Sequence, residues 1–217
     1  MSRKPSVVPP RRIAMAITGA SGAVYGLRVL EELLKQRDIE LHLTISESAR
    51  KVLAVEHGIA VDLQKFNPKA LKVPGAERAV YHHFENVAAP IASGSFRVEA
   101  MAIVPCSMGS VGGIAHGLSD DLIQRAADVM IKEKRPLVVV PRETPLSAIH
   151  LENLLALARL GVTVLPAAPG FYGKPQSVSE MVDFIVARIL DHLNVTHDLG
   201  PRWGEAHPLS PPGRGRT

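Results

Sequence analysis

The chain has 217 residues, enough for one ordinary domain with a sizeable core and too few for two substantial domains. Hydrophobic residues make up 46% of it and charged residues 21%, a globular composition that excludes intrinsic disorder for the body. The net charge of +4 comes from the two ends, since residues 1–12 carry +4 and residues 202–217 carry +2 while the rest carries −2. Because the basic residues lie at the ends and only 4% of residues are aromatic, the sequence argues against a nucleic-acid partner.

The sequence also predicts the extent of the domain and its compartment. No apolar run approaches the roughly 20 residues that a membrane span requires, and the Pro- and Arg-rich N-terminal stretch lacks the apolar core of a secretory signal. We therefore expect a cytoplasmic protein with one domain over residues 12–208, a disordered basic extension over 1–11 and a disordered tail over 209–217. The single cysteine, Cys106, excludes an internal disulfide and a cysteine-based metal centre.

The N-terminal part of the domain predicts two strand–helix units. An apolar run over residues 12–18 ends at a glycine, and the apolar residues between 24 and 34 follow at helical spacing. Residues 41–45 predict a second strand, and Ser46 is suited to cap a helix that runs to about Glu56.

The rest of the domain continues this alternation after an irregular segment. Residues 58–96 contain three spaced prolines and predict loops with at most short strands. A buried strand over residues 100–104 is halted by Pro105. The remaining predicted elements are a helix over 122–133, a strand over 137–140, a helix from Thr144-Pro145 to about Leu160 with Thr144 as its cap, a strand over 162–165 and a helix over 179–193.

Strands that are continuous apolar runs are typical of a parallel sheet buried on both faces. Their alternation with helices predicts a doubly wound, three-layer α/β fold. In such a sheet the loops that follow the strands gather at one edge, where ligands bind. We therefore expect the site in these segments: 18–22, Ser46, 105–110, 141–144 and 166–176.

Two of these segments are rich in small residues. In residues 18–26 (TGASGAVYG) the glycines permit close backbone approach, and free amides at the start of the following helix would attract a phosphate; tight strand–helix packing is the structural alternative. Residues 105–110 (PCSMGS) offer hydroxyls for a phosphate or a planar heterocycle. Cys106 is more typical of a buried small residue than of a nucleophile, because no His-Asp pair is evident to activate it.

Charged and aromatic residues mark the other candidate segments. The adjacent pair Arg142-Glu143 follows a buried strand, where it would be costly unless it contacts a ligand or partner. The rigid loop over residues 169–175 presents Tyr172, and Trp203 is either a core anchor or a lid. Neither the histidines nor Asp120-Asp121, which lacks a third aspartate, has metal-ligand spacing, so we expect no metal.

Taken together, these segments resemble the UbiX family of flavin prenyltransferases, in order, over about residues 12–205. The matching motifs are TGASGAVYG (18–26), TISESAR (44–50), PIASGS (90–95), PCSMGS (105–110), QRAADVMIKEKRPLVVVPRETP (124–145) and LPAAPGFYGKPQS (165–177). The resemblance implies a flavodoxin-like or Rossmann-like fold. It also implies that reduced FMN receives a dimethylallyl group from dimethylallyl monophosphate. The product, prenylated FMN, is the cofactor of UbiD-type decarboxylases, as in ubiquinone biosynthesis or aromatic acid decarboxylation.

The resemblance further implies a homo-oligomer, commonly a dodecamer, whose sites are built by neighbouring subunits. It assigns FMN binding, allylic phosphate binding and catalysis to three overlapping sets of residues. FMN would be held by Gly19, Ala20, Ser21, Ser46, Ser107, Met108, Gly109, Ser110 and Arg142. The phosphate would be held by Lys132, Arg142, Tyr172 and Arg188, and the catalytic set would be Ser21, Glu56, Lys132, Glu143 and Trp203.

The chemistry implied is coherent with these residue types. Breaking the allylic carbon–oxygen bond leaves negative charge on the phosphate, which cationic side chains would stabilise, and positive charge on the allyl group, which Trp203 would stabilise. Glu143 or the departing phosphate would accept the ring proton. A monophosphate does not require a magnesium clamp.

Two other functions remain open from the sequence. An FMN-dependent cysteine decarboxylase of the same fold would carry an Asn-Thr that residues 90–95 lack. A non-catalytic FMN-binding partner of a decarboxylase would not need Lys132, Glu143 or Tyr172. Where Thr-Leu is typical of the family this chain has Ser110-Val111, and the following Gly112-Gly113 predicts a loose stretch that would alter the choice of allylic substrate.

Overall fold

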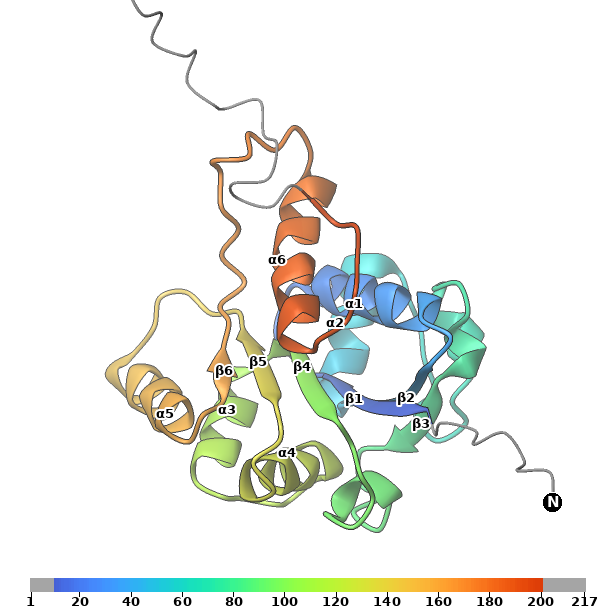
Figure 1. Ribbon diagram of the computed structural model, residues 1–217, viewed down its shortest axis with the longest axis vertical. Helices are drawn as coiled ribbons and strands as arrows, with labels where there is room; N and C mark the ends of the chain where they lie inside the picture. The colour runs from blue at the N-terminus through green and yellow to red at the C-terminus, as the bar shows by residue number, and fades with distance from the viewer. Residues whose placement is uncertain (1–9, 201–217) are drawn as a thin grey trace, which may run out of the picture.

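The computed structural model describes residues 10–200, whose core is one parallel sheet with the strand order β3-β2-β1-β4-β5-β6 (Figure 1). This order is that of the nucleotide-binding Rossmann fold, and it confirms the doubly wound class expected from the sequence. The strands are β1 (Arg11–Ile17), β2 (Ile39–Ile45), β3 (Val80–His83), β4 (Ala100–Cys106), β5 (Leu137–Pro141) and β6 (Thr163–Val164).

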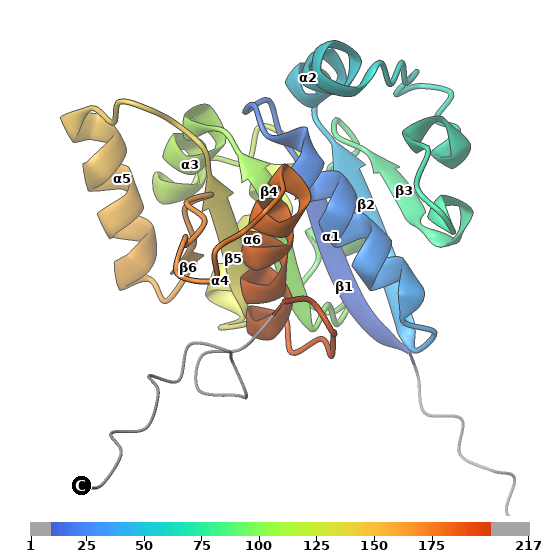
Figure 2. The same ribbon diagram turned by 90° about the horizontal axis from the view of Figure 1, so that it is seen from above.

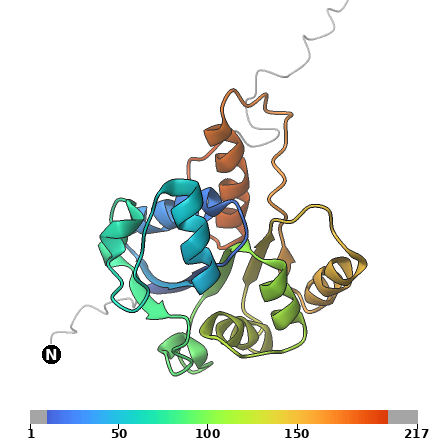
Figure 3. The same ribbon diagram turned by 180° about the vertical axis from the view of Figure 1, so that it is seen from behind.

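Helices cover both faces of the sheet and make the outer layers. Helices α1 and α6 lie side by side on one face, and α3 and α4 pack on the other, with α5 against α3 (Figures 1 and 3). Seen from above, α2 stands over the ends of the strands (Figure 2). The α-helices are α1 (Ala23–Lys35), α2 (Glu47–His57), α3 (Met108–Ala115), α4 (Leu122–Lys132), α5 (Ala148–Arg159) and α6 (Val178–His192), and three short 3-10 turns lie at Pro68–Leu71, Ala76–Arg78 and Pro90–Ala92.

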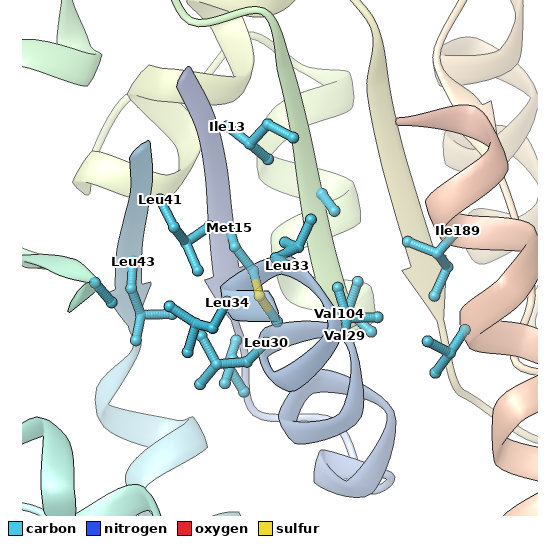
Figure 4. Close-up of a cluster of buried hydrophobic side chains, with 14 of the residues drawn as sticks. Ile13, Met15, Val29, Leu30, Leu33, Leu34, Leu41, Leu43, Val104 and Ile189 are labelled. Carbon is cyan, nitrogen blue, oxygen red and sulfur yellow. The ribbon is translucent and has the colours of Figure 1, made fainter. Parts of the chain in front are cut away.

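The central strand β1 explains why the strands are continuous apolar runs in the sequence. Ile13, Met15 and Ile17 belong to the core on the α1 side, while Ala14 and Ala16 belong to the core on the α3 and α4 side. All five are almost fully buried. Figure 4 shows leucines of α1 and β2 packed around Met15. Each such leucine stabilises the fold by about 1.5–3 kcal/mol relative to an exposed one.

A polar cluster is buried under the other face of β2 and β3. Glu40 Oε1 lies 2.9 Å from His42 Nε2, so the neutral His42 carries its proton on Nε2 and donates to this carboxylate. Its Nδ1 then accepts from His82 Nε2 at 2.9 Å. Burial lowers the pKa of both His42 and His82, which favours the neutral rings.

The structure corrects three details of the sequence expectation. The helix predicted from Thr144-Pro145 begins at Ala148, because the Ser147 hydroxyl accepts the backbone N–H of His150 and caps the helix there. The candidate loop over residues 105–110 is helical from Met108, where α3 begins, and Gly112-Gly113 is part of this helix rather than loose. A Cβ at Gly113 would approach Gln124 Nε2 to 2.7 Å, so this glycine permits close packing of α3 on α4.

Within residues 10–200, no helix is both long enough and apolar enough to cross a membrane. The extension predicted over 1–11 overlaps the described chain at residues 10 and 11, and Arg11 opens β1 and forms an ion pair with Glu99 at 2.6 Å. Trp203, the tail over 209–217 and the end of the domain at 208 lie outside the described residues.

Candidate functional site

The candidate site lies at the edge of the sheet where the strands end. Strand order reverses between β1 and β4, so the chain leaves β1 toward α1 on one face and leaves β4 toward α3 on the other. Thr18 holds the two loops together, since its Oγ1 donates to the carbonyl of Pro105 at 2.9 Å and accepts the backbone N–H of Ser107 at 2.7 Å. The sequence placed Thr18 in a candidate segment but gave no sign of this bridging role. This reversal point is the position at which doubly wound folds bind their ligands.

Two of the predicted serines are helix caps at this edge. Ser46 Oγ accepts the backbone N–H of Ala49 at 3.1 Å at the start of α2, which confirms the predicted cap. Ser107 Oγ accepts the backbone N–H of Ser110 at 3.3 Å at the start of α3, and the two hydroxyls lie 3.0 Å apart. Remaining first-turn N–H groups of a helix attract anions, so both helix starts favour a negatively charged ligand.

The start of α1 is different, because a carboxylate of the chain already occupies it. Glu56 accepts the backbone N–H of Gly22 at 3.0 Å and that of Ala23 at 2.9 Å. The expectation that these amides are free to take a phosphate is therefore wrong. Burial raises the pKa of Glu56, but hydrogen bonds from Ser21, Ala23 and Gly22 outweigh it, and the pKa lies below its ordinary value.

Arg142 joins the loop after β5 to the loop after β1. Its Nε donates to the backbone carbonyl of Ser21 at 3.0 Å. This contact holds a guanidinium beside the reversal point, and its Nη atoms remain to bind an anion in the geometry that phosphate favours. The neighbouring Glu143 is exposed, and its Oε1 accepts the backbone N–H of Thr144 at 3.0 Å.

Glycines set the shape of the same edge. A Cβ at Gly19 would lie 2.3 Å from the Cβ of Ser48, so only glycine lets the loop after β1 approach α2 this closely. At Gly109, by contrast, the nearest atom to an added Cβ is Ser107 Oγ at 4.0 Å, which leaves open space over the first turn of α3. Ala20 and Met108 are buried beneath the edge and support it.

Lys132 does not lie at this edge in a single chain. It is the last residue of α4 and is exposed. The chain then runs from the start of β5 through its five residues before it reaches Arg142, a separation of roughly 15 Å at about 3.3 Å per residue. Lys132 therefore belongs to the opposite edge of the sheet.

Tyr172 and Arg188 line a separate cavity of about 620 Å³ along α6. The Tyr172 ring meets that of Phe184 edge to face, with centroids 5.7 Å apart. The end of α6 lies near the start of β1, because Arg11 Nη2 donates to the carbonyl of Leu193 at 3.4 Å. The other lining residues are Gly170, Gly173, Pro175, Glu180, Asp183, Ala187, Asp191, His197, Leu199 and Gly200.

The structure brings most of the predicted flavin residues together and leaves part of the phosphate set elsewhere. Residues 19–21, Ser46, residues 107–110 and Arg142 share the carboxyl edge with Glu56 and Glu143. Lys132, Tyr172 and Arg188 lie on other surfaces of the same chain. Cys106 is fully buried and burial raises its thiol pKa to about 12, which confirms it as a packing residue rather than a nucleophile. Across the described range, no three His, Cys, Asp or Glu residues are grouped to hold a metal ion.

Comparison with known proteins agrees with this geometry. Residues 1–190 match the model of the flavoprotein family. The flavin prenyltransferase UbiX of Pseudomonas aeruginosa is 49% identical over 206 residues, which are 93% of this chain and 98% of that protein.

Two solved structures are similar over nearly their whole length. A dodecameric FMN-dependent UbiX-like decarboxylase from Escherichia coli O157:H7 is 40% identical, covers 88% of this chain and 98% of its own, and superposes with a TM-score of 0.80. AnUbiX (PadA1), solved in complex with FMN and dimethylallyl pyrophosphate, is also 40% identical, covers 89% of this chain and 97% of its own, and gives a TM-score of 0.79.

Proposed function

The chain belongs to the UbiX family of flavin prenyltransferases, and from that premise we propose that it transfers a dimethylallyl group from dimethylallyl monophosphate to reduced FMN. The observation that carries this proposal is the reversal point between β1 and β4, because the capped starts of α2 and α3, Arg142 and the open position at Gly109 lie at this one edge of the sheet. A relative that is 40% identical was solved with FMN and dimethylallyl pyrophosphate, a ligand pair of the same chemical class. The product would serve a UbiD-type decarboxylase.

The residues at the reversal point fit the chemistry of a flavin mononucleotide. A phosphate requires N–H and O–H donors and a cation, which the starts of α2 and α3, the serine hydroxyls and Arg142 provide. A planar ring system requires open space with small residues around it, which Gly109 supplies. Reduced FMN, when bound, supplies an electron-rich ring that accepts the allyl group. Its proposed ligands are Gly19, Ala20, Ser21, Ser46, Ser107, Met108, Gly109, Ser110 and Arg142.

The proposed roles of the chain follow the charge that the reaction develops. Arg142, Lys132 and Arg188 would stabilise the negative charge on the departing phosphate, with Tyr172 donating a hydrogen bond. Ser21 would orient the reacting groups, and Glu56 would hold the loop that carries Ser21 through the amides of α1. Glu143 would accept the proton that leaves the ring, and Trp203 would cover the allyl group. No metal is required by this proposal.

The separation of the phosphate ligands supports a site shared between subunits. Because Lys132, Tyr172 and Arg188 lie away from Arg142 in one chain, neighbouring copies would supply them. The outer side of α5 is suited to such assembly, since Leu151 and Leu155 lie one helical turn apart and are 54% and 50% exposed. The E. coli relative is a dodecamer, and we propose the same assembly for this chain. We also propose the cytoplasmic location that the sequence predicts.

The decisive experiment is the mass of the flavin after incubation. Purified protein with reduced FMN and dimethylallyl monophosphate, without added metal and with a chelator present, should yield a flavin heavier by one C5H8 unit. A parallel reaction with the diphosphate decides the choice of ester, and a reaction without protein is the control. No mass gain with either ester overturns the prenyltransferase function. Release of carbon dioxide from a peptide C-terminal cysteine would instead favour the cysteine decarboxylase.

A further inference from the structure

We propose that His197 is a positioning residue for Arg188 and acts through the carboxylate of Asp191. The three side chains form one hydrogen-bonded relay beside the cavity on α6. The inference deepens the proposed function, because it rests on Arg188 as a ligand of the allylic phosphate.

The direction of each hydrogen bond in the relay follows from the structure. The backbone N–H of Leu199 donates to His197 Nδ1 at 3.1 Å, so Nδ1 is the acceptor nitrogen of the neutral ring. Nε2 then carries the proton and donates to Asp191 Oδ1 at 3.2 Å. The other carboxylate oxygen, Oδ2, accepts from Arg188 Nη1 at 3.1 Å.

The two ends of the relay differ in how far their side chains are exposed to solvent. The His197 side chain is only 2% exposed, whereas that of Arg188 is 53% exposed, with Asp191 between them at 24%. The fixed ring therefore holds the carboxylate in one orientation, and the carboxylate limits the rotamers of a long, solvent-facing guanidinium. A side chain restrained before binding loses less conformational entropy when it binds an anion.

The segment that carries His197 adds to this arrangement. Residues 193–199 turn back after α6, and the contacts of His197 with Asp191 and Leu199 hold this turn against the last turn of the helix. Gln36 Nε2 also donates to the carbonyl of Thr196 at 3.1 Å, which joins the same turn to the end of α1. The relay therefore rests on the body of the domain and not on a free loop.

The test uses the full assembled protein with FMN bound. His197→Phe removes both ring hydrogen bonds and should raise the KM for dimethylallyl monophosphate about fivefold to tenfold, less than the loss of a charge-assisted contact because Arg188 itself remains, with a smaller change in kcat. His197→Gln, which can still donate to Asp191, should restore KM to within about twofold of the parent. His192→Gln, an exposed histidine one residue beyond Asp191, is the matched control and should leave KM unchanged.

A double-mutant cycle separates positioning from a general loss of structure. In an Arg188→Ala background, His197→Phe should cause no further rise in KM, because its effect passes through Arg188. Thermal unfolding and light scattering confirm that each variant is folded and assembled. The affinity for inorganic phosphate, measured by calorimetry, supplies a readout that does not need turnover. It should be weaker in His197→Phe than in the parent and close to the parent in His197→Gln.

The outcomes distinguish this inference from the proposed function. If no prenylated flavin forms but phosphate affinity depends on Arg188 and on His197 as described, the reaction is wrong and the relay stands. If prenylated flavin forms but a folded His197→Phe variant keeps its KM, or still raises KM without Arg188, the relay is wrong and the reaction stands. If neither turnover nor phosphate binding depends on Arg188, the relay is also wrong.

Discussion

Glu56 accepts the backbone N–H of Ala23 at 2.9 Å, so a carboxylate from the last turn of α2 caps the first turn of α1. The same carboxylate accepts the backbone N–H of Gly22, which has a positive φ of 100°. Since Arg142 holds the adjoining carbonyl of Ser21, the loop after β1 is fixed from α2 and from β5 at once.

We expect Glu56→Gln to lower the free energy of unfolding at pH 7 by less than about 1 kcal/mol, because solvent screens an exposed carboxylate at a helix start. The pKa of Glu56 is lowered in the folded state, so its contribution is present above the unfolded pKa of about 4.3 and is lost as the pH falls through the folded pKa. Urea unfolding of the variant and the parent at pH 7 and pH 3 measures the difference in their free energies of unfolding. A gap between variant and parent that persists at pH 3 would contradict the assignment, and Glu77→Gln on the surface is the control.

Glu143→Gln should retain FMN and slow product formation by about a hundredfold, as expected when a proton acceptor is lost. The side chain is exposed and bonds only locally to Thr144 N, so the substitution should leave the melting temperature unchanged. Single-turnover mass spectrometry with saturating FMN measures the chemical step, and Glu77→Gln again serves as control. Equal rates in the variant and parent would remove Glu143 from the reaction and leave the departing phosphate as the acceptor.

The buried histidine pair predicts a loss of stability in weak acid. The pKa values of His42 and His82 are lowered by burial, so their contribution is complete above the unfolded pKa of about 6.5 and falls as the pH drops below it. Glu40 and Arg12 face His42 with opposing effects on its charge, and Phe96 lies against its ring.

We expect unfolding free energies from pH 8 to pH 5 to decline less steeply in His82→Gln, which can still donate to His42 but does not titrate. One histidine accounts for at most about 1.4 kcal/mol per pH unit. His192→Gln, on the exposed end of α6, should keep the slope of the parent. An unchanged slope in His82→Gln would show that the pair is not the source of the acid sensitivity.

The outer face of α5 predicts the effect of a charge on assembly. Leu155 is 50% exposed on a helix whose buried residues are Asn153 and Leu157. Leu155→Lys should reduce the oligomer to smaller species without unfolding the subunit, since Leu155 belongs to neither core cluster and the substitution places a charge in the proposed interface. Light scattering coupled to size exclusion measures the mass. Val55→Lys, at an 86% exposed position on α2, is the control. A full-size Leu155→Lys oligomer would place the interface elsewhere.

The sequence predicted the layers of this fold well because their signals are local. Apolar runs such as Val138 to Val140, buried on both faces, predict central parallel strands without any knowledge of their neighbours. The cap at Ser46 also follows from neighbouring residues alone. The start of α5 was mistaken because Thr144-Pro145 resembles a cap as closely as Ser147 does, and only the backbone beyond β5 decides between them.

Contacts between distant segments were beyond such reasoning. Glu56 and Ala23 are separated by 33 residues, and Arg142 and Ser21 by 121. The residue types indicated anion binding, but which amides are already occupied depends on how α2 packs above β1. The separation of Lys132 from Arg142 likewise follows from the direction of β5 and not from their spacing of ten positions in the sequence.

The open space at Gly109 separates the shape of the proposed flavin site from the packing of the core. It lies in the first turn of α3 with no atom closer than 4.0 Å to an added Cβ, so alanine or serine there would fit the backbone and disturb no core residue. Such a side chain would instead narrow the room above the helix. At the proposed flavin site, a single added methyl group at Gly109 would therefore change which ring system fits while leaving the packing of the core unchanged.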